Sequence, residues 1–158
     1  MTGAILQYGQ LLATSILVGK VLLLSFVVAP ILASTLEREP FSDVVRRLFP
    51  AYYLLGIAAV GLGLLFTLGM GLSEGWTTAG LATVGLWLAV GAAEFYCRSA
   101  LTPHSNAMRD TMKEQEARGV VDQALRQSWE RLHRQSVWLN SLVLLAGLLL
   151  LGLSSRRS

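Results

Sequence analysis

The sequence has little charge, almost no cysteine and few signs of catalysis. Only 15% of its 158 residues are charged, whereas 53% are hydrophobic, a composition that is too apolar for an ordinary soluble domain. Its single cysteine, Cys97, excludes a disulfide within the chain. There is no Gly-rich phosphate loop ending in Lys-Ser or Lys-Thr, and no His-Glu-x-x-His zinc motif. We therefore expect a membrane protein that is not an enzyme.

Four stretches are long and apolar enough to cross a bilayer. A membrane-spanning helix needs roughly 20 consecutive apolar residues, and the stretches that qualify are 11–32, 52–72, 77–96 and 137–153. The first has no basic residue before it and no convincing small-residue cleavage site, so we expect a retained span and not a signal peptide. The sequence predicts one all-α integral membrane domain over 1–158, folded as a four-transmembrane-helix bundle in the lipid bilayer.

The distribution of lysine and arginine predicts the orientation of the chain. Ranges 33–51 and 98–135 together carry ten basic residues, whereas the termini carry two, Arg156 and Arg157. Basic segments beside membrane spans stay in the cytoplasm. Both termini are therefore expected outside, with the long segment between the third and fourth spans in the cytoplasm. The net charge of +3 follows from this topology, and no nucleic-acid partner is expected.

The cytoplasmic segment 98–135 is expected to form a helical hairpin that extends the last span. Thr102 is the predicted N-cap of its first helix, Pro103 the first helical position and Gly119 the stop. After Gly119, good helix formers run without a break into the fourth span. One helix is thus predicted from about Val120 to Leu153, projecting well beyond the bilayer.

Two shorter features are predicted near the first loop. Pro30 is expected to end the first span, because proline weakens a helix interior. The stretch "SDVVRRLF" at 42–49 places its apolar residues on one helical face, which predicts a short interfacial helix lying on the bilayer.

Small residues predict close packing of the second span against the third. They recur every four positions on both: Ala59, Gly63, Thr67 and Gly71 on the second span, and Gly85, Ala89, Ala93 and Cys97 on the third. Ridges of this kind let two helices approach closely. The pattern favours a packing role for Cys97 over a role as a reactive thiol.

Lys20 lies near the middle of the first span. A charge there costs at least ~2.5 kcal/mol, so it normally faces the bundle interior and has a partner. The expected partners are Glu94 on the third span and Asn140 or Ser141 on the fourth. Two interpretations stay open: a buried ion pair that fixes the register of the bundle, and a water-lined cavity, open to the cytoplasm, where a solute or proton binds.

A second group of polar residues is predicted in the cytoplasmic hairpin. His104 and His133 lie at similar distances on either side of Gly119, so antiparallel helices place them at one height. Met108 lies one turn from His104, and Glu130 lies three residues before His133. This set suits copper or zinc, and two histidines at one height also suit a haem iron. The alternative is a hydrogen-bonded histidine pair in a helix contact.

The stretches "SFVVAPILASTLEREPFSDVVRRLFPAYYLLG" and "WERLHRQSVWLNSLVLLAGLLLLGL", with "CRSALTPHSNAMR" between them, resemble the transmembrane protein 205-like family, also catalogued as a domain of unknown function (DUF4149). The resemblance rests on Phe26, Ala29, Pro30, Phe49, Pro50, Tyr53, Arg98, Pro103, Arg109, His133, Ser136 and Asn140. It implies a small helical membrane protein with about four spans. Some eukaryotic members are associated with tolerance of platinum drugs, and copper-resistance D-like proteins look like distant relatives. This sequence lacks a Met-rich cluster of the copper-handling kind.

Two functions from different classes are consistent with the sequence. In the first, which we favour, the protein handles a small solute or metal cation at a cytoplasm-facing polar cavity, giving stress or toxic-cation tolerance. This predicts polar volume around Lys20 and Glu94. In the second, the protein is an accessory or structural subunit that docks on a larger membrane complex or associates with itself. This predicts a tightly packed bundle with an apolar outer stripe.

Overall fold

The computed structural model describes residues 2–120 and 122–155, and these are almost entirely helical. The elements, in chain order, are α1 (Thr2–Leu23), the π-helical turn η1 (Leu24–Val28), α2 (Ala29–Thr35), α3 (Arg38–Glu74), α4 (Thr78–Tyr96), a second π-helical turn η2 (Cys97–Leu101), α5 (Thr102–Ala117) and α6 (Gln123–Ser155). Within these residues, four continuous helices are long and apolar enough to cross a membrane. The predicted all-α, four-helix architecture is confirmed.

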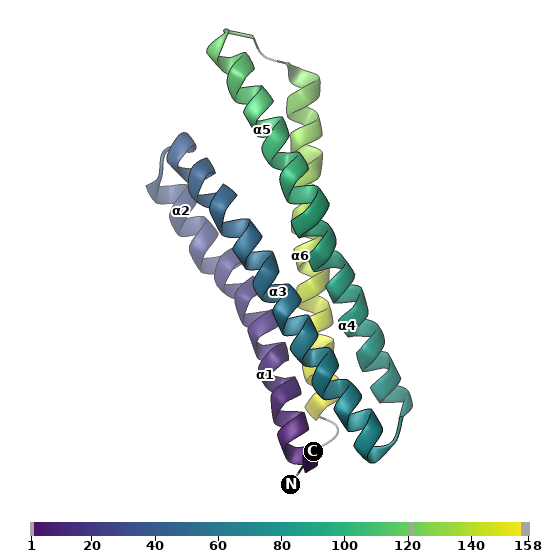
Figure 1. Cartoon of the computed structure of the whole chain (residues 1–158). Coiled ribbons are helices and arrows are strands. Elements are labelled where there is room, and N and C mark those ends of the chain that lie inside the picture. The colour runs from purple at the N-terminus through teal and green to yellow at the C-terminus, as the bar shows by residue number, and fades with distance from the viewer. Residues whose placement is uncertain (1, 121, 156–158) are drawn as a thin grey trace.

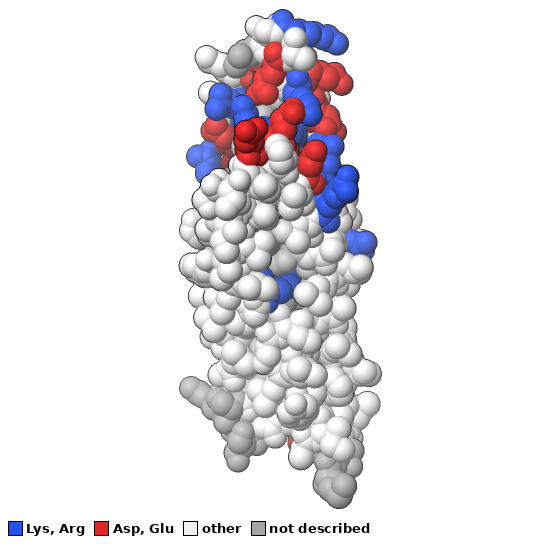
Figure 2. All heavy atoms as spheres, turned by 90° about the vertical axis from the view of Figure 1, so that its left-hand side faces the viewer, with Lys and Arg blue, Asp and Glu red and all other residues white. Residues whose placement is uncertain are grey.

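The four helices form one elongated antiparallel bundle (Figure 1). α1 packs against α3 and α6, and α4 packs against the same two helices from the other side. The α5–α6 hairpin extends beyond the end of α2, as predicted for this segment (Figure 1). Charged side chains gather over that end of the molecule, whereas the surface below it is nearly uncharged (Figure 2). We refer to this end, formed by α2, the start of α3, α5 and the start of α6, as the charged end.

Two predicted helix boundaries, at Pro30 and at Thr102, are wrong for the same reason. In both places the chain stays helical through a π-turn that ends two residues before a proline, Pro30 or Pro103. A proline ring clashes with the carbonyl four residues earlier in a regular α-helix, and the wider π-turn relieves such a clash. Thr102 is therefore inside a helix, where its hydroxyl donates to the carbonyl of Cys97 at 2.7 Å.

The stretch 42–49 is not a separate interfacial helix. It forms part of α3, which runs unbroken through Pro50. Ion pairs hold this upright extension against α5 at the charged end: Arg38 with Glu116 at 3.2 Å, Arg46 with Asp110 at 2.5 Å and Lys113 with Glu39 at 2.9 Å. The extension thus has a protein partner, which a helix lying on the bilayer would not have.

The packing prediction is right for α3 and half right for the third span, where Cys97 is buried in the core and Ala93 packs against it. All four small residues of α3 are buried, but Gly85 and Ala89 of α4 are exposed. α4 buries instead a face that carries Trp87 and Glu94. A methyl group added to Gly63 would overlap the Trp87 ring, so the small-residue groove of α3 holds a tryptophan and not a second ridge. A tryptophan is the larger packing element, because its ring makes many dispersion contacts with the helix that receives it.

The hairpin turn follows the prediction at its start but not at its end. α5 ends at Ala117, and Gly119 has a positive φ of 71°, which suits a glycine after a helix C-terminus. α6, however, begins at Gln123 and not at Val120. The carboxylate of Asp122 accepts hydrogen bonds from the backbone N–H groups that follow it, as an N-cap does.

Candidate functional site

Lys20 and Glu94 form a buried ion pair between α1 and α4. The ammonium Nζ lies 2.6 Å from Glu94 Oε1, and the two side chains are 3% and 1% exposed. Nζ also donates to the carbonyl of Tyr52 at 3.4 Å and sits 3.9 Å from the centre of the Tyr52 ring. A methyl group on Gly56 would overlap both charged groups. Glycine at this position therefore makes the room that the pair occupies.

The second oxygen of Glu94 is unusual. Oε2 is buried and has no hydrogen-bond partner among the described residues. An unpaired buried acceptor is costly and calls for an explanation, such as a functional role. The carboxylate thus has one oxygen that accepts a hydrogen bond from Lys20 and one that accepts none from the described residues.

A hydrogen-bonded link runs from this pair to α6. The hydroxyl of Tyr52 donates to Asn140 Oδ1 at 2.8 Å, and Asn140 Nδ2 donates to the hydroxyl of Tyr53 at 3.2 Å. Asn140 therefore reaches Lys20 through Tyr52 and not directly. Ser141 lies outside the link, since it is exposed and its hydroxyl donates to the carbonyl of Val137 on its own helix.

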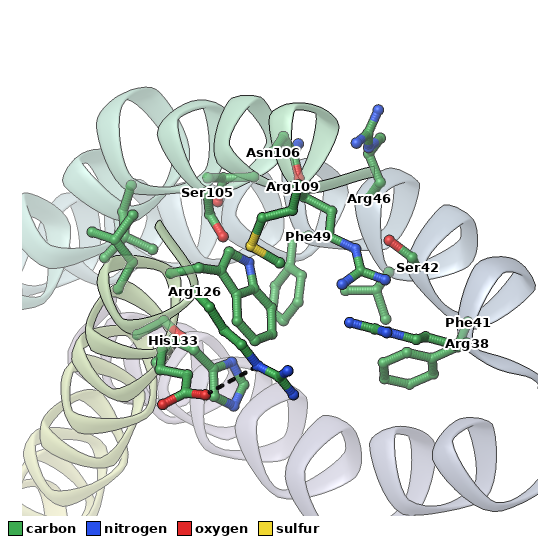
Figure 3. Close-up of a pocket in the computed structure, with 18 of the residues that line it drawn as sticks. Arg38, Phe41, Ser42, Arg46, Phe49, Ser105, Asn106, Arg109, Arg126 and His133 are labelled. Carbon is green, nitrogen blue, oxygen red and sulfur yellow. Dashed lines mark hydrogen bonds and ion pairs between the residues drawn. The ribbon is translucent and has the colours of Figure 1, made fainter. Parts of the chain in front are cut away.

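A pocket of about 350 Å³ lies at the charged end between α3, α5 and α6. Its walls combine aromatic side chains with basic ones: Phe41, Phe49 and Trp129, together with Arg38, Arg46, Arg109, Arg126 and His133. Figure 3 shows Arg38, Arg109 and Arg126 reaching into it from α3, α5 and α6 respectively. Tyr53 and Ser136 also line it, and on their helices they are the lining residues nearest the membrane span. The link through Asn140 thus ends in this pocket.

The residues predicted to bind a metal are not gathered into one site. His133 and Glu130 line the pocket, whereas His104 and Met108 do not. The imidazole of His133 stacks on Trp129, with ring centres 5.7 Å apart. The described residues contain no group of three or more His, Cys, Asp or Glu side chains placed to hold a metal ion. A copper, zinc or haem site here stays a prediction.

The space beside Lys20 differs from the predicted polar cavity. Lys20 lines a groove of about 450 Å³ between α1 and α3, whose other walls are apolar except for Ser15 and Tyr52. Figure 2 shows a basic side chain recessed in a hollow of the uncharged band. Glu94 does not line this groove. The polar volume lies instead in the pocket at the charged end.

One stretch has the spacing of a serine-hydrolase motif. Residues 71–75 read Gly-Leu-Ser-Glu-Gly, but they close a membrane helix, whereas the motif requires a sharp strand-to-helix turn. The hydroxyl of Ser73 donates to the carbonyl of Gly69 at 2.9 Å on its own helix. The geometry is that of a helix C-terminus.

Comparison with known proteins identifies a family but no function. A family model described as "Domain of unknown function (DUF4149)" matches residues 12–114. This range holds both members of the ion pair and the α3 and α5 walls of the pocket. No curated protein and no solved structure matches the chain.

Proposed function

The chain belongs to the DUF4149 family, whose description assigns no function, and from its own residues we propose that it is a non-enzymatic membrane protein that binds a small solute. The binding site is the pocket at the charged end (Figure 3). The likeness to transmembrane protein 205-like proteins supports a role in tolerance of a toxic solute.

One observation carries the proposal: the pocket is joined to the buried ion pair. Tyr53 lines the pocket and bonds to Asn140, which bonds to Tyr52, whose carbonyl and ring hold Lys20. Buried ionisable residues in membrane helices commonly mark solute or proton pathways. An ion pair that only fixed the register of the bundle would not need a polar link to a surface pocket.

The charge asymmetry supports a cytoplasmic location for the pocket. The ten basic residues that predict a cytoplasmic side lie, with few exceptions, near the pocket end of the bundle (Figure 2). By the positive-inside rule this end faces the cytoplasm. The solute would then be taken from the cytoplasmic side.

A pocket-blocking variant tests the proposal. Ser105 is half-buried and lines the pocket, so Ser105→Trp fills it, whereas Ala107→Trp places the same ring on the exposed side of α5. Each protein is purified in lipid nanodiscs, and the small molecules that copurify are identified by mass spectrometry. We expect a molecule that is present with the wild type and Ala107→Trp and absent with Ser105→Trp. The same set of molecules in all three samples would refute the proposal.

The alternative function, as an accessory subunit, rests on the outer face of α4. Ala82, Gly85, Ala89 and Ala92 are all exposed there, and small residues of this kind let a further helix approach closely. The copurification experiment separates the two functions, since a subunit would bring other protein chains with it and a solute-binding protein a small molecule.

A further inference from the structure

The basic side chains of the pocket outnumber its carboxylates. Glu130 is the one carboxylate among its described lining residues, against four arginines and a histidine. Three of the arginines are already paired: Arg46 with Asp110, Arg38 with Glu116, and Arg126 more loosely with Glu130 at 3.8 Å. The charge of these three is thus partly balanced within the protein.

Arg109 is the exception. It makes no close ion pair among the described residues, although, in addition to Lys113, its charge helps to lower the pKa of Glu39 from farther away. Its guanidinium lies over the ring of Trp129, 6.0 Å from the ring centre. An arginine offers five N–H donors in a planar fork that fits carboxylate, sulfonate or phosphate oxygens. Figure 3 shows this side chain extending from α5 into the pocket. Among the described lining residues, Arg109 is therefore the arginine that contacts an aromatic ring and has no carboxylate within ion-pair distance.

The uncharged part of the wall combines apolar and aromatic side chains with the polar residues Ser42, Thr102, Ser105, Asn106 and Ser136. Phe49 is half-buried at the end of the pocket that contains Tyr53, with its ring stacked on Tyr53 at 5.7 Å between centres. Met112 is buried on the α5 side. The ring of Trp129 stacks on the imidazole of His133. Ligand pockets of this kind use apolar walls for affinity and a few polar groups for orientation. A small inorganic ion would leave these walls without a partner.

We propose that the pocket takes a ligand with one anionic group and an apolar body, in which Arg109 binds the anionic group and the rings of Phe49 and Trp129 contact the body. This inference rests on the proposed function, since it names the ligand class of the same pocket. The ligand chemistry has two sources, the headgroup of an anionic membrane lipid and a free amphiphilic anion.

A matched set of three probes tests the sign of the charge. Naphthalenesulfonate, neutral naphthalenemethanol and cationic naphthylmethylammonium are titrated by calorimetry into the protein in nanodiscs of phosphatidylcholine. We expect the sulfonate to bind most tightly, and Arg109→Gln to weaken it about tenfold, equivalent to about 1.4 kcal/mol, without changing the binding of the neutral probe. Arg131→Gln is the control, because Arg131 is exposed on α6 and does not line the pocket.

The outcomes separate this inference from the proposed function. Equal sulfonate affinity in the wild type and Arg109→Gln, or tighter binding of the ammonium probe, overturns the inference. If Ser105→Trp nevertheless abolishes the binding of whichever probe the wild type binds, the proposal of a solute pocket stands. If Ser105→Trp changes the binding of none of the probes, both fall.

A second arm of the experiment identifies the source of the anion. The sulfonate titration is repeated in nanodiscs of phosphatidylcholine mixed equally with phosphatidylglycerol. A lipid ligand predicts that the sulfonate binds more weakly in the mixed discs of the wild type but not of Arg109→Gln. A free amphiphile predicts equal affinity in both kinds of disc. Either result supports an anion site at Arg109, provided that the Arg109→Gln effect is present.

Discussion

Removing one partner of the Lys20–Glu94 pair should destabilise the protein strongly, and removing both should not. Lys20→Met keeps the aliphatic stem, and Glu94→Gln keeps the shape of the carboxylate. Breaking one side of a buried ion pair typically costs ~3–5 kcal/mol, whereas replacing both charges is often nearly neutral. Because the side chains are 3% and 1% exposed, solvent does little to offset the loss of a partner.

The contacts predict that the two single variants are unequal. In Lys20→Met, Oε1 of Glu94 loses the hydrogen bond from the ammonium, and because Oε2 has no partner among the described residues, both buried oxygens are then unpaired. In Glu94→Gln, the ammonium keeps the carbonyl and the ring of Tyr52, and the new amide oxygen can still accept from it. We expect Lys20→Met near the upper end of that range, about 5 kcal/mol, and Glu94→Gln near the lower end, about 3 kcal/mol.

The assay is a double-mutant cycle. Thermal denaturation in one detergent measures the stability of the wild type, the two single variants and the double variant. The double variant should be more stable than either single variant. Additive losses would mean that the two groups do not interact, and would refute the pairing. Equal losses in the two single variants would contradict the assigned role of Tyr52. If the double variant recovers stability but loses the copurifying solute, the pair belongs to the functional site, and if it recovers both, the pair is structural.

Three further predictions concern packing, pH and topology. Gly56→Ala should destabilise the protein by several kcal/mol, because its methyl group overlaps the ion pair, whereas Gly61→Ala, with open space around it, should be neutral or stabilising by up to about 1 kcal/mol in the same denaturation assay. The ion pair with Lys113 holds the pKa of Glu39 below its ordinary value, so the α3–α5 contact should lose stability as the pH falls through that lowered pKa. At low salt, Glu39→Gln should remove this pH dependence of stability, and the same loss of stability at acid pH in both proteins would contradict the prediction. A cysteine placed at Glu116, in a chain whose natural cysteine has been replaced, should react with a membrane-impermeant reagent only after the membrane is opened, and labelling of intact cells would reverse the topology.

The helices were predictable because their signal is local. Four apolar stretches fix the number of spans, and a lone lysine in one of them demands a partner in another. Glu94 was one of three expected partners, with Asn140 and Ser141, and the structure places Lys20 and Glu94 in contact. The side chain of Ser141 gives no comparable signal, since a serine in a membrane helix can bond to its own backbone.

The faces of the helices were harder to predict, because large side chains decide them. Small residues mark a groove but not what fills it, and on α4 the bulk of Trp87 outweighs the regular spacing of Gly85 and Ala89. The pocket was missed for a different reason. Its arginines were counted only as topology signals, and nothing in their spacing shows which of the described pocket arginines, in this case Arg109, makes no close ion pair.

Asn140 is the residue that joins the two halves of the candidate site. Its amide oxygen accepts from Tyr52, and its amide nitrogen donates both to Tyr53 and to the carbonyl of Ser136. The Ser136 contact fixes the amide's orientation, because a backbone carbonyl can only accept, whereas a tyrosine hydroxyl can donate or accept. A ligand that shifts Tyr53 must then act on the tyrosine that holds Lys20, and a change at Lys20 must act on the pocket by the same coupling free energy, since linkage between two sites is reciprocal. The Asn140 amide couples the ion pair to the pocket because it bonds to both tyrosines. The coupling free energy between ligand binding and the ion pair then measures how far the buried pair serves binding, and the remainder of its effect serves the fold.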